Sequence, residues 1–321
     1  MINALPEHPT IAVLIPCYNE EIAIGKVVRD FCAALPQAAI YVYDNNSTDR
    51  TVEEAENAGA LVRRERLQGK GNVLRRMFAD VEADIYVLVD GDDTYDASCA
   101  PQLIAHLIDE RLDMVNAARE TDIQAAYRPG HRFGNRLLTG LISYIFGKQV
   151  SDILSGYRVF SRRFVKSFPA LSTGFETETE LTVHALELHM PLAEIKTPYK
   201  DRPQGSASKL HTFRDGFRIL KTILILVKRE RPMQLFSLIA GIFFLIAIVL
   251  FIPLLITYQQ TGLVPRIPTA VLVAGIMVLS FLSLVCGIIL DSVTCGRREA
   301  KRIWYLRIPV LHNGKTPSDN A

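Results

Sequence analysis

The sequence predicts an α/β fold, in which a mostly parallel sheet is flanked by helices, followed by two membrane-spanning helices. Short apolar segments alternate with helical segments over residues 10–109, which is typical of repeated strand–helix units. Polar and acidic residues follow three of the predicted strands, at the edge of the sheet where such folds bind ligands. Two long runs without a charged residue lie between residues 235 and 290.

The alternating region divides into four strand–helix pairs. Apolar and β-branched residues predict strands at 10–15, 40–43, 61–64 and 85–89, and helical periodicity predicts helices at 20–35, 49–58, 70–81 and 98–109. The alternation weakens after residue 118. Beyond it we expect a helix with an acidic start at 175–189 and a loop containing Pro and Gly at 194–209.

The two uncharged runs predict transmembrane helices at residues 235–257 and 269–290. In the first run, 17 of 23 residues are Leu, Ile, Val or Phe. Each run is long enough to cross a hydrocarbon core of about 30 Å, and Pro253 is tolerated inside a membrane helix. The alternative is a pair of buried helices in a soluble core, but soluble helices of this length rarely lack a polar face.

Basic residues are distributed unevenly around these runs, which predicts their orientation. They are Arg214, Arg218, Lys221, Lys228, Arg229 and Arg231 before the first run, and Arg297, Arg298, Lys301 and Arg302 after the second. The connecting segment contains only Arg266. By the positive-inside rule, both termini and the N-terminal domain are expected in the cytoplasm. The basic segment 213–227 predicts an interfacial helix, and Trp304 and Tyr305 are expected to anchor the chain at the interface.

The overall composition excludes several classes of protein. With 49% hydrophobic residues, 22% charged residues and a net charge of +2, the chain is neither disordered nor collagen-like, and it lacks the basic excess of a nucleic-acid binder. We expect no signal peptide before residue 20, because no basic segment leads an apolar stretch there. The five cysteines lack paired or metal-binding spacing, as expected in a reducing cytosol.

An acidic motif follows the fourth predicted strand. Asp90, Asp92 and Asp93 lie within four residues, and Gly91 allows the tight turn that directs carboxylates to one point. Carboxylates this close repel one another unless a cation or water intervenes. Hard oxygen ligands in small number suit Mg²⁺ or Mn²⁺ shared with a diphosphate. A solvated acidic turn is the alternative, and the apolar strand before the motif favours a site.

Two further polar segments follow strands or precede helices. The segment from Asp44 to Asp49 can form an Asx turn and a helix N-cap, and the same groups can bind a base or ribose. Lys70 lies between two glycines at the start of a helix, where backbone N–H groups bind phosphate. The spacing is not that of a Walker loop.

Taken together, these motifs resemble the inverting family-two glycosyltransferases with a GT-A fold. The matching segments are Pro16-Cys17-Tyr18-Asn19-Glu20-Glu21, Asp44…Ser47…Asp49, Gly69-Lys70-Gly71 and Asp90-Gly91-Asp92. Downstream segments are similar to the dolichol-phosphate mannose synthase and bacterial polyprenyl-phosphate glycosyltransferase group. They are Ser151-Asp152, Ser155-Gly156-Tyr157-Arg158, Glu176…Glu178…Glu180-Leu181, Glu194…Pro198 and Arg202…Gly205…Ser208-Lys209-Leu210. The resemblance covers residues 10–230, and the two C-terminal spans match two-helix bacterial members.

The resemblance implies roles for individual residues. The nucleotide sugar is expected at Pro16, Tyr18, Asn19, Glu20, Asp44, Asn46, Lys70, Asp90 and Gly91. The metal, Mg²⁺ or Mn²⁺, is expected on Asp90 and Asp92. The acceptor phosphate is expected on Arg119, Arg132, Arg202, Ser208 and Lys209, and Glu180 is expected to shape the acceptor side. Asp92 and Arg202 are the expected catalytic residues.

The sequence departs from the family pattern at three places. Asn45 and Asn46 replace the usual Asp and Gly of the second-strand motif, which leaves the base unidentified. Thr94 stands where a Gln often follows the metal motif. The loop from Arg202 to Lys209 is one residue longer than usual, which leaves open which of its side chains contacts substrate.

The expected activity is transfer of a hexose or N-acetylhexosamine from a UDP- or GDP-linked sugar to a polyprenyl monophosphate, with inversion. The predicted domains are a cytoplasmic GT-A domain at 1–210, a juxtamembrane helix at 211–234, the transmembrane pair within 235–290 and a cytoplasmic basic tail at 291–321. The chain is therefore expected to be a multi-pass protein of the cell (inner) membrane, with its partners the nucleotide sugar, the lipid and the membrane, and without nucleic acid. Homo-oligomerisation stays open.

Three alternatives stand beside this activity. A processive polysaccharide synthase shares the fold, but it needs more spans and a Gln-Xaa-Xaa-Arg-Trp motif, whereas Ile303 precedes Trp304, the single tryptophan. A non-catalytic membrane scaffold with a degenerate transferase domain is disfavoured by the intact acidic motif. A soluble dinucleotide enzyme is disfavoured because Gly-Xaa-Gly-Xaa-Xaa-Gly does not follow the first strand.

Overall fold

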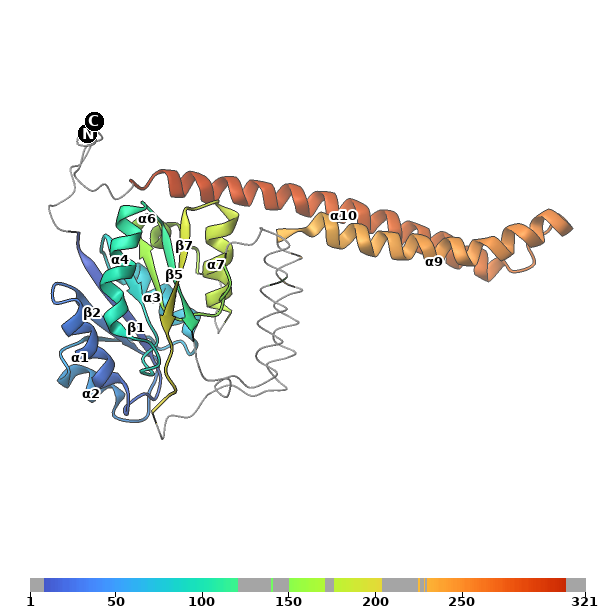
Figure 1. The fold of residues 1–321 in the computed structure, drawn as a ribbon. Coiled ribbons are helices and arrows are strands. Elements are labelled where there is room, and N and C mark those ends of the chain that lie inside the picture. Colours follow the sequence, from blue (N-terminus) through green and yellow to red (C-terminus); the bar gives the residue numbers. More distant parts are fainter. Residues whose placement is uncertain are drawn as a thin grey trace, which may run out of the picture. The chain divides into compact units, whose positions relative to one another are not determined.

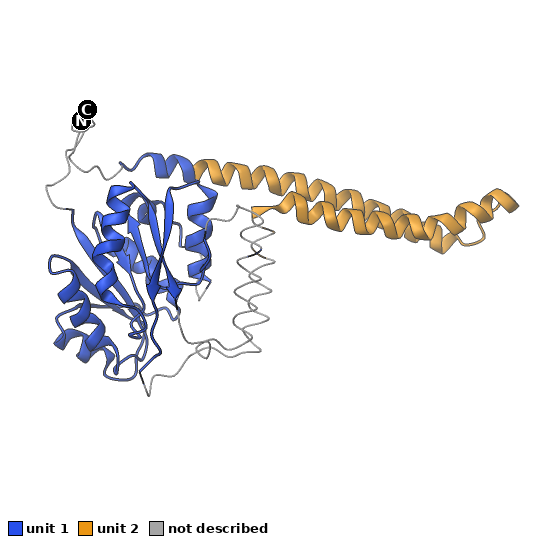
Figure 2. Ribbon diagram, viewed as in Figure 1, with its two compact units in different colours: residues 1–217, 301–321 blue, residues 218–300 orange. Residues whose placement is uncertain are grey.

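The computed structural model describes residues 9–120, 150–170, 176–203 and 230–309, together with Gly140, Ile225 and Lys228. The chain divides into two compact units (Figure 2), one of residues 1–217 with 301–321 and one of residues 218–300. The predicted interfacial helix at 213–227 lies outside the described residues except for Ile225.

The first unit is built on a seven-stranded sheet with the order β3-β2-β1-β4-β6-β5-β7 (Figure 1). The alternating elements of its first half are β1 (Ile11–Cys17), α1 (Ile24–Ala34), β2 (Ala39–Asp44), α2 (Thr51–Asn57), β3 (Leu61–Arg64), α3 (Lys70–Asp80), β4 (Ile85–Leu88), the 3₁₀ turn η1 (Ala97–Cys99) and α4 (Ala100–Asp109). Strands β3, β2, β1 and β4 pair in parallel. The predicted α/β class is confirmed, and every strand and helix predicted before residue 110 is present within a few residues of its expected ends.

The second half of the sheet is mixed, because one strand runs against the others. The elements are β5 (Met114–Glu120), β6 (Arg158–Ser161), α6 (Arg162–Ser167), α7 (Thr177–Glu187) and β7 (Leu192–Pro198). Strand β6 is antiparallel to both β4 and β5, whereas β5 and β7 are parallel.

The prediction of a loop at 194–209 is wrong for residues 194–198, because these residues belong to β7. This strand lies at the edge of the sheet, so all of its residues except Thr197 are at least partly exposed and its sequence does not show a buried apolar run. Pro198 closes the strand, a position where an edge strand tolerates a residue without an N–H donor.

The sheet separates two hydrophobic layers, and β1 shows how. Its side chains alternate in direction: Val13 and Ile15 pack with residues of α1, α2 and α4, while Ala12 and Leu14 pack with residues of α3, α6 and α7. Both faces of the strand are therefore buried, which explains why it reads as a continuous apolar run. The strand ends that carry the polar motifs all lie at one edge of the sheet.

Helix α7 contains a histidine enclosed by aromatic rings. His184 is 2% exposed, its Nε2 lies 3.1 Å from the Ser167 hydroxyl, and the rings of Phe164 and Phe168 meet it edge-on. Burial lowers the pKa of His184 to about 3, because the imidazolium would lose its hydration there.

This histidine is expected to destabilise the fold in acid. The unfolded chain takes up a proton near pH 6.5 and the folded chain only near pH 3, so stability falls as the pH decreases between these values and is unaffected above them. Between pH 7 and pH 5, we expect the free energy of unfolding of the wild type to fall by about 2 kcal/mol more than that of His184→Gln. Unfolding of both proteins followed at the two pH values measures this difference, and equal pH dependence would contradict it.

The second unit contains two long antiparallel helices, α9 (Pro232–Thr261) and α10 (Ile267–Leu306), of which α10 continues past Ala300 into the first unit. Both helices are long and apolar enough to cross a membrane. They extend beyond the predicted spans, and α10 continues as helix through the first part of the predicted tail. Within the pair, the Ser280 hydroxyl donates to the carbonyl of Ala240 at 2.8 Å, and a Cβ on Gly287 would lie 3.0 Å from that of Phe236. Small residues thus allow the helices to approach closely.

The last residues of α10 belong to the first unit and are bonded to it. The Tyr305 hydroxyl donates to a carboxylate oxygen of Asp113 at 2.8 Å, and the guanidinium of Arg163 lies 4.7 Å from the centre of the Tyr305 ring. Lys301 pairs with the buried Glu187 at 2.5 Å. The expectation of Tyr305 as an interfacial anchor is therefore wrong, since its side chain is buried against the first unit, while Trp304 is 60% exposed.

Candidate active site

The loops that follow β1 and β2 are joined by hydrogen bonds. The Asn19 side chain accepts from the Thr48 N–H at 2.8 Å, and the Ser47 hydroxyl accepts from the Asn19 N–H at 2.9 Å. Asp44 is fully buried; one of its oxygens accepts from the Ser47 N–H and the other from Arg64. Pro16 lies within β1, the Tyr18 side chain is 36% exposed, and the Glu20 N–H donates to Thr51. These predicted nucleotide-binding residues therefore lie at the ends of β1 and β2 and in the two linked loops that follow them.

The two asparagines that depart from the family pattern have clear structural roles. Asn45 is nearly buried, donates to the carbonyls of Glu65 and Leu67 and accepts from the Gly69 N–H, so it fixes the turn before α3. Asn46 has a φ of 65°, in the left-handed region that Asn tolerates better than most other residues except Gly. Asn46 can therefore stand at this position in a backbone conformation that usually favours Gly.

The two expected metal ligands lie at the end of β4, each in contact with a basic side chain. Asp90 Oδ1 is 2.6 Å from Lys70 Nζ, and Asp92 Oδ2 is 2.6 Å from Arg202 Nη2. The Thr94 hydroxyl donates to Asp92 Oδ1 at 2.6 Å, which gives this departure from the family pattern a role in orienting the carboxylate. Burial raises the pKa of Asp92 and the charge of Asp90 raises it further, while Arg202 and Thr94 oppose the shift.

Glycines bring other segments close to this acidic pair. A Cβ on Gly91 would lie 2.6 Å from Cys17 Sγ, so β1 and the acidic turn pack without space for a side chain. A Cβ on Gly156 would lie 2.2 Å from Asp90 Oδ2. The segment before β6 thus packs directly against the Asp90 carboxylate.

Lys70, at the first position of α3, contacts a second carboxylate that was not among the predicted site residues. Its Nζ lies 2.5 Å from Glu178 Oε1, and the Glu178 side chain is 8% exposed. Burial by itself lowers the pKa of Lys70, but the charges of Asp90 and Glu178 outweigh burial and raise it. The acidic run 176–180 was the available signal. Without the phase of its helix, the sequence could not show which glutamate faces the site.

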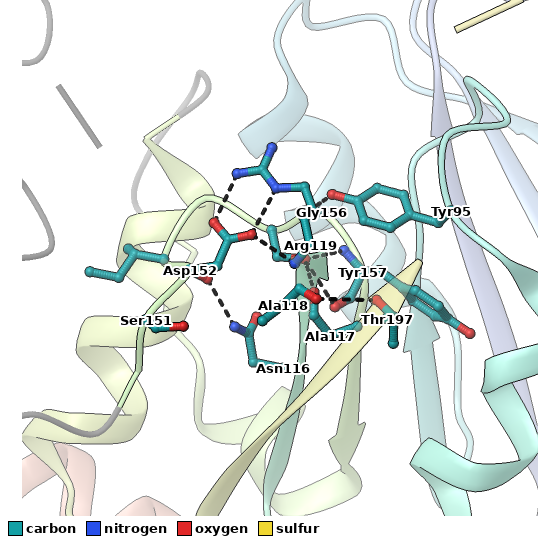
Figure 3. Close-up of polar contacts among 12 residues, drawn as sticks. Tyr95, Asn116, Ala117, Ala118, Arg119, Ser151, Asp152, Gly156, Tyr157 and Thr197 are labelled. Carbon is teal, nitrogen blue, oxygen red and sulfur yellow. Dashed lines mark hydrogen bonds and ion pairs between the residues drawn. The ribbon is translucent and has the colours of Figure 1, made fainter. Parts of the chain in front are cut away.

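Arg119, at the end of β5, forms a bidentate pair with Asp152 (Figure 3). Its Nε and Nη2 lie 2.7 and 2.8 Å from the two carboxylate oxygens. Burial raises the pKa of Asp152, but Arg119 outweighs burial and lowers it below its ordinary value. The carbonyl of Asp152 accepts from Asn116, and the Tyr95 hydroxyl accepts from the Gly156 N–H at 2.8 Å. The segment 152–156 therefore connects the Arg119 pair to the acidic motif.

The segment 152–156 also accepts hydrogen bonds from a buried arginine. Arg158 is fully buried; it donates to the carbonyls of Ile153 and Ser155 and to the Thr182 hydroxyl. Burial lowers the pKa of Arg158 to about 10. Its role in this structure is to fix the turn between Asp152 and β6.

The residues present fit a divalent cation. Asp90 and Asp92 offer hard carboxylate oxygens on one turn, of the kind that Mg²⁺ and Mn²⁺ bind. Among the described residues, no three His, Cys, Asp or Glu side chains converge as a complete metal centre. Arg132, Ser208 and Lys209, three of the expected acceptor residues, lie outside the described residues.

Adding a methyl group at residue 156 tests the geometry around Asp90. Gly156→Ala places a Cβ where the carboxylate now lies, so either Asp90 or the 152–156 segment must move. We expect Mn²⁺ binding to weaken about tenfold, as for loss of a charge-assisted contact. The control is Gly296→Ala on α10, at a helical site where a Cβ meets nothing within 4 Å. Unchanged Mn²⁺ affinity in Gly156→Ala, measured by electron paramagnetic resonance, would contradict the packing described.

Comparisons with known proteins agree with this geometry. Residues 12–168 match the family model described as Glycosyl transferase family 2. Glycosyltransferase AglJ of Haloferax volcanii is 34% identical over 239 residues, which cover 73% of this chain and 77% of the relative. A dolichyl-phosphate hexose transferase of the same organism is 30% identical over 222 residues, or 69% of this chain and 95% of the relative.

Solved structures show the same fold. Glucosyl-3-phosphoglycerate synthase from Mycobacterium tuberculosis, in complex with Mn²⁺, UDP-glucose and glycerol 3-phosphate, superposes with a TM-score of 0.57 at 24% identity. The superposition covers 69% of this chain and 80% of that one.

Proposed function

Because this chain belongs to glycosyltransferase family 2, we propose that it transfers a hexose or N-acetylhexosamine from a nucleoside diphosphate sugar to a polyprenyl monophosphate, with inversion. This places it in the dolichol-phosphate mannose synthase and bacterial polyprenyl-phosphate glycosyltransferase group. The observation that carries the proposal is the acidic pair Asp90 and Asp92 at the strand ends, in contact with Lys70 and Arg202. Two helices long enough to cross a membrane accompany it in the same chain.

The donor side of the proposal rests on the loops around β1, β2 and α3. We assign the nucleoside to the linked loops that contain Asp44 and Asn19, and the diphosphate to the turn at Asp90 and Asp92. A divalent metal held by these carboxylates supplies positive charge for the leaving diphosphate. Lys70 adds a fixed positive charge at the N-terminus of α3, where backbone N–H groups also favour an anion.

The acceptor side needs binding and orientation rather than proton removal. A phosphate monoester has a second pKa of about 6, so its oxygen is already an anion at neutral pH. That oxygen attacks the anomeric carbon as the bond from this carbon to the diphosphate breaks, which inverts the centre. We assign Arg202 and Arg119 to the acceptor phosphate, together with Arg132, Ser208 and Lys209. Arg119 already gives two donors to Asp152, so phosphate must share its guanidinium.

The direct test is a panel of radiolabelled nucleotide sugars offered to membranes that contain the protein, followed by extraction of the lipids. The proposal expects label in the organic phase for one UDP- or GDP-linked sugar, dependent on added polyprenyl phosphate and on Mg²⁺ or Mn²⁺. Transfer to water or to a soluble acceptor alone would contradict the lipid acceptor. A complete lack of turnover with every donor would favour the non-catalytic scaffold.

The same proposal places the catalytic unit and both termini in the cytoplasm, with α9 and α10 as a multi-pass anchor in the cell (inner) membrane. Basic residues are more frequent before α9 and at the end of α10 than in the segment that joins the two helices. By the positive-inside rule, this distribution favours a cytoplasmic location for both ends. A reporter that works only in the cytoplasm should be active when fused after Ala321. A reporter that works only outside the cytoplasm should be active when inserted at Gly262, between α9 and α10. The reverse pattern would overturn the orientation.

A further inference from the structure

Lys70 is held between two carboxylates from distant parts of the chain. Its Nζ contacts Asp90 Oδ1 at 2.6 Å and Glu178 Oε1 at 2.5 Å, and the lysine side chain is only 13% exposed. Asp90 comes from the turn after β4, whereas Glu178 comes from the first turn of α7. One carboxylate is enough to neutralise a lysine, so the second requires a separate explanation.

Glu178 is unusual because one of its carboxylate oxygens is buried without a hydrogen bond to any described residue. This oxygen is Oε2, and the side chain is 92% buried. Burying a carboxylate is unfavourable unless its oxygens are bonded. The neighbouring acidic residues of this run, Glu176 and Glu180, are only partly buried. Glu178 is therefore the most buried glutamate of the run, and it contacts Lys70 of the site.

We infer that Glu178 is a positioning residue, which holds Lys70 beside the acidic pair so that the ammonium group remains available to the diphosphate of the donor. The inference rests on the proposed function. A lysine ammonium has three N–H donors, and the structure places two of them on Asp90 and Glu178. When a divalent cation binds Asp90, the ammonium keeps its bond to Glu178 and stays in place. Without the Glu178 charge, Lys70 pairs with Asp90 alone and competes with the cation for it.

The test compares Glu178→Gln with the matched control Glu176→Gln in the full-length protein in detergent. Calorimetry with UDP or GDP in the presence of Mn²⁺ measures nucleotide binding, and electron paramagnetic resonance measures Mn²⁺ binding alone. We expect Glu178→Gln to weaken both about tenfold, the effect of losing one charge-assisted hydrogen bond. Glu176→Gln should stay within about twofold of the wild type.

A double-mutant cycle with Lys70→Met separates positioning from a direct charge effect. If Glu178 acts through Lys70, then Glu178→Gln causes less than about a twofold further loss once Lys70 is replaced. An equal loss in both backgrounds means that Glu178 acts on the cation by its own charge, and this overturns the inference. If Glu178→Gln does not fold, the double-mutant cycle is made with Glu178→Asp, whose side chain is one methylene shorter.

The result also separates this inference from the proposed function. A wild-type protein that binds neither UDP nor GDP with Mn²⁺ contradicts the proposed function. Wild-type binding that is unchanged by Glu178→Gln and by Glu178→Asp contradicts the positioning role alone.

Discussion

Replacing Asp92 by asparagine should lower kcat for sugar transfer by about 10³-fold, because the loss of a metal ligand removes several kcal/mol of charge stabilisation from the leaving diphosphate. The carboxylate is 4% exposed and is oriented by Thr94 on one oxygen and Arg202 on the other. Asparagine keeps the size and the acceptor for Thr94 but not the negative charge. Transfer assays with labelled donor, at saturating Mn²⁺, measure the loss.

The next residue supplies a matched control. Asp93 lies on the same turn with a φ of 56°, a conformation that asparagine also tolerates, and its carboxylate pairs with Lys26 on α1 rather than with the site. Asp93→Asn should therefore retain transfer within about threefold, since exposed ion pairs contribute little. Equal losses in the two variants, or near wild-type transfer in Asp92→Asn, would exclude Asp92 as a metal ligand.

Arg202→Ala is expected to lower kcat/KM for the polyprenyl phosphate by about a hundredfold, which corresponds to a charge-assisted contact with phosphate. Its guanidinium lies 2.6 Å from Asp92 and is 33% exposed, so it can meet an anion from the solvent side. The apparent KM for the lipid should rise and turnover should fall. Arg202→Lys should restore only part of the activity, because an ammonium lacks the planar fork that matches phosphate oxygens.

Nucleotide affinity distinguishes this acceptor role from a role in the donor site. In calorimetry with nucleotide and Mn²⁺, the dissociation constant of Arg202→Ala should stay within about threefold of the wild-type value. The partly exposed charge that this variant loses is expected to act mainly on the polyprenyl phosphate. Lys200→Ala, an exposed change two residues away, should leave both measurements unaltered. Donor binding that weakens as much as acceptor use would make the assignment of Arg202 to the acceptor wrong.

The sequence predicted the first half of the sheet well because local signals agree there. Each strand from β1 to β4 is buried or ends at a polar turn, and each intervening helix has an apolar face toward one of the two layers. The second half was harder, because β6 is only four residues long and β7 is a partly exposed edge strand. Their pairing depends on contacts far apart in the chain, which periodicity within a segment does not report.

The candidate site shows the same division. Asp90, Asp92 and Lys70 were predicted from motifs that stand directly at strand or helix ends. The partners that the structure adds, Glu178 for Lys70 and Asp152 for Arg119, lie 108 and 33 residues from them. Arg202 was predicted for the acceptor, but its contact with Asp92 depends on how residue 202 follows β7, an element that the sequence did not reveal.

The bonds made by the end of α10 affect how the catalytic unit can be produced in isolation. A fragment that stops before α9 lacks Tyr305 and Lys301, and so leaves the buried carboxylates of Asp113 and Glu187 without two of their partners. Glu187 then loses the lysine that neutralises it, and a buried carboxylate without its cation is strongly destabilising, whereas Asp113 keeps its ion pair with Arg163. Residues 218–300, which contain most of α9 and α10, are thus inserted between two segments of the first unit in the sequence. A soluble version should therefore rejoin residues 301–309 through a linker, or replace Glu187 with a neutral side chain.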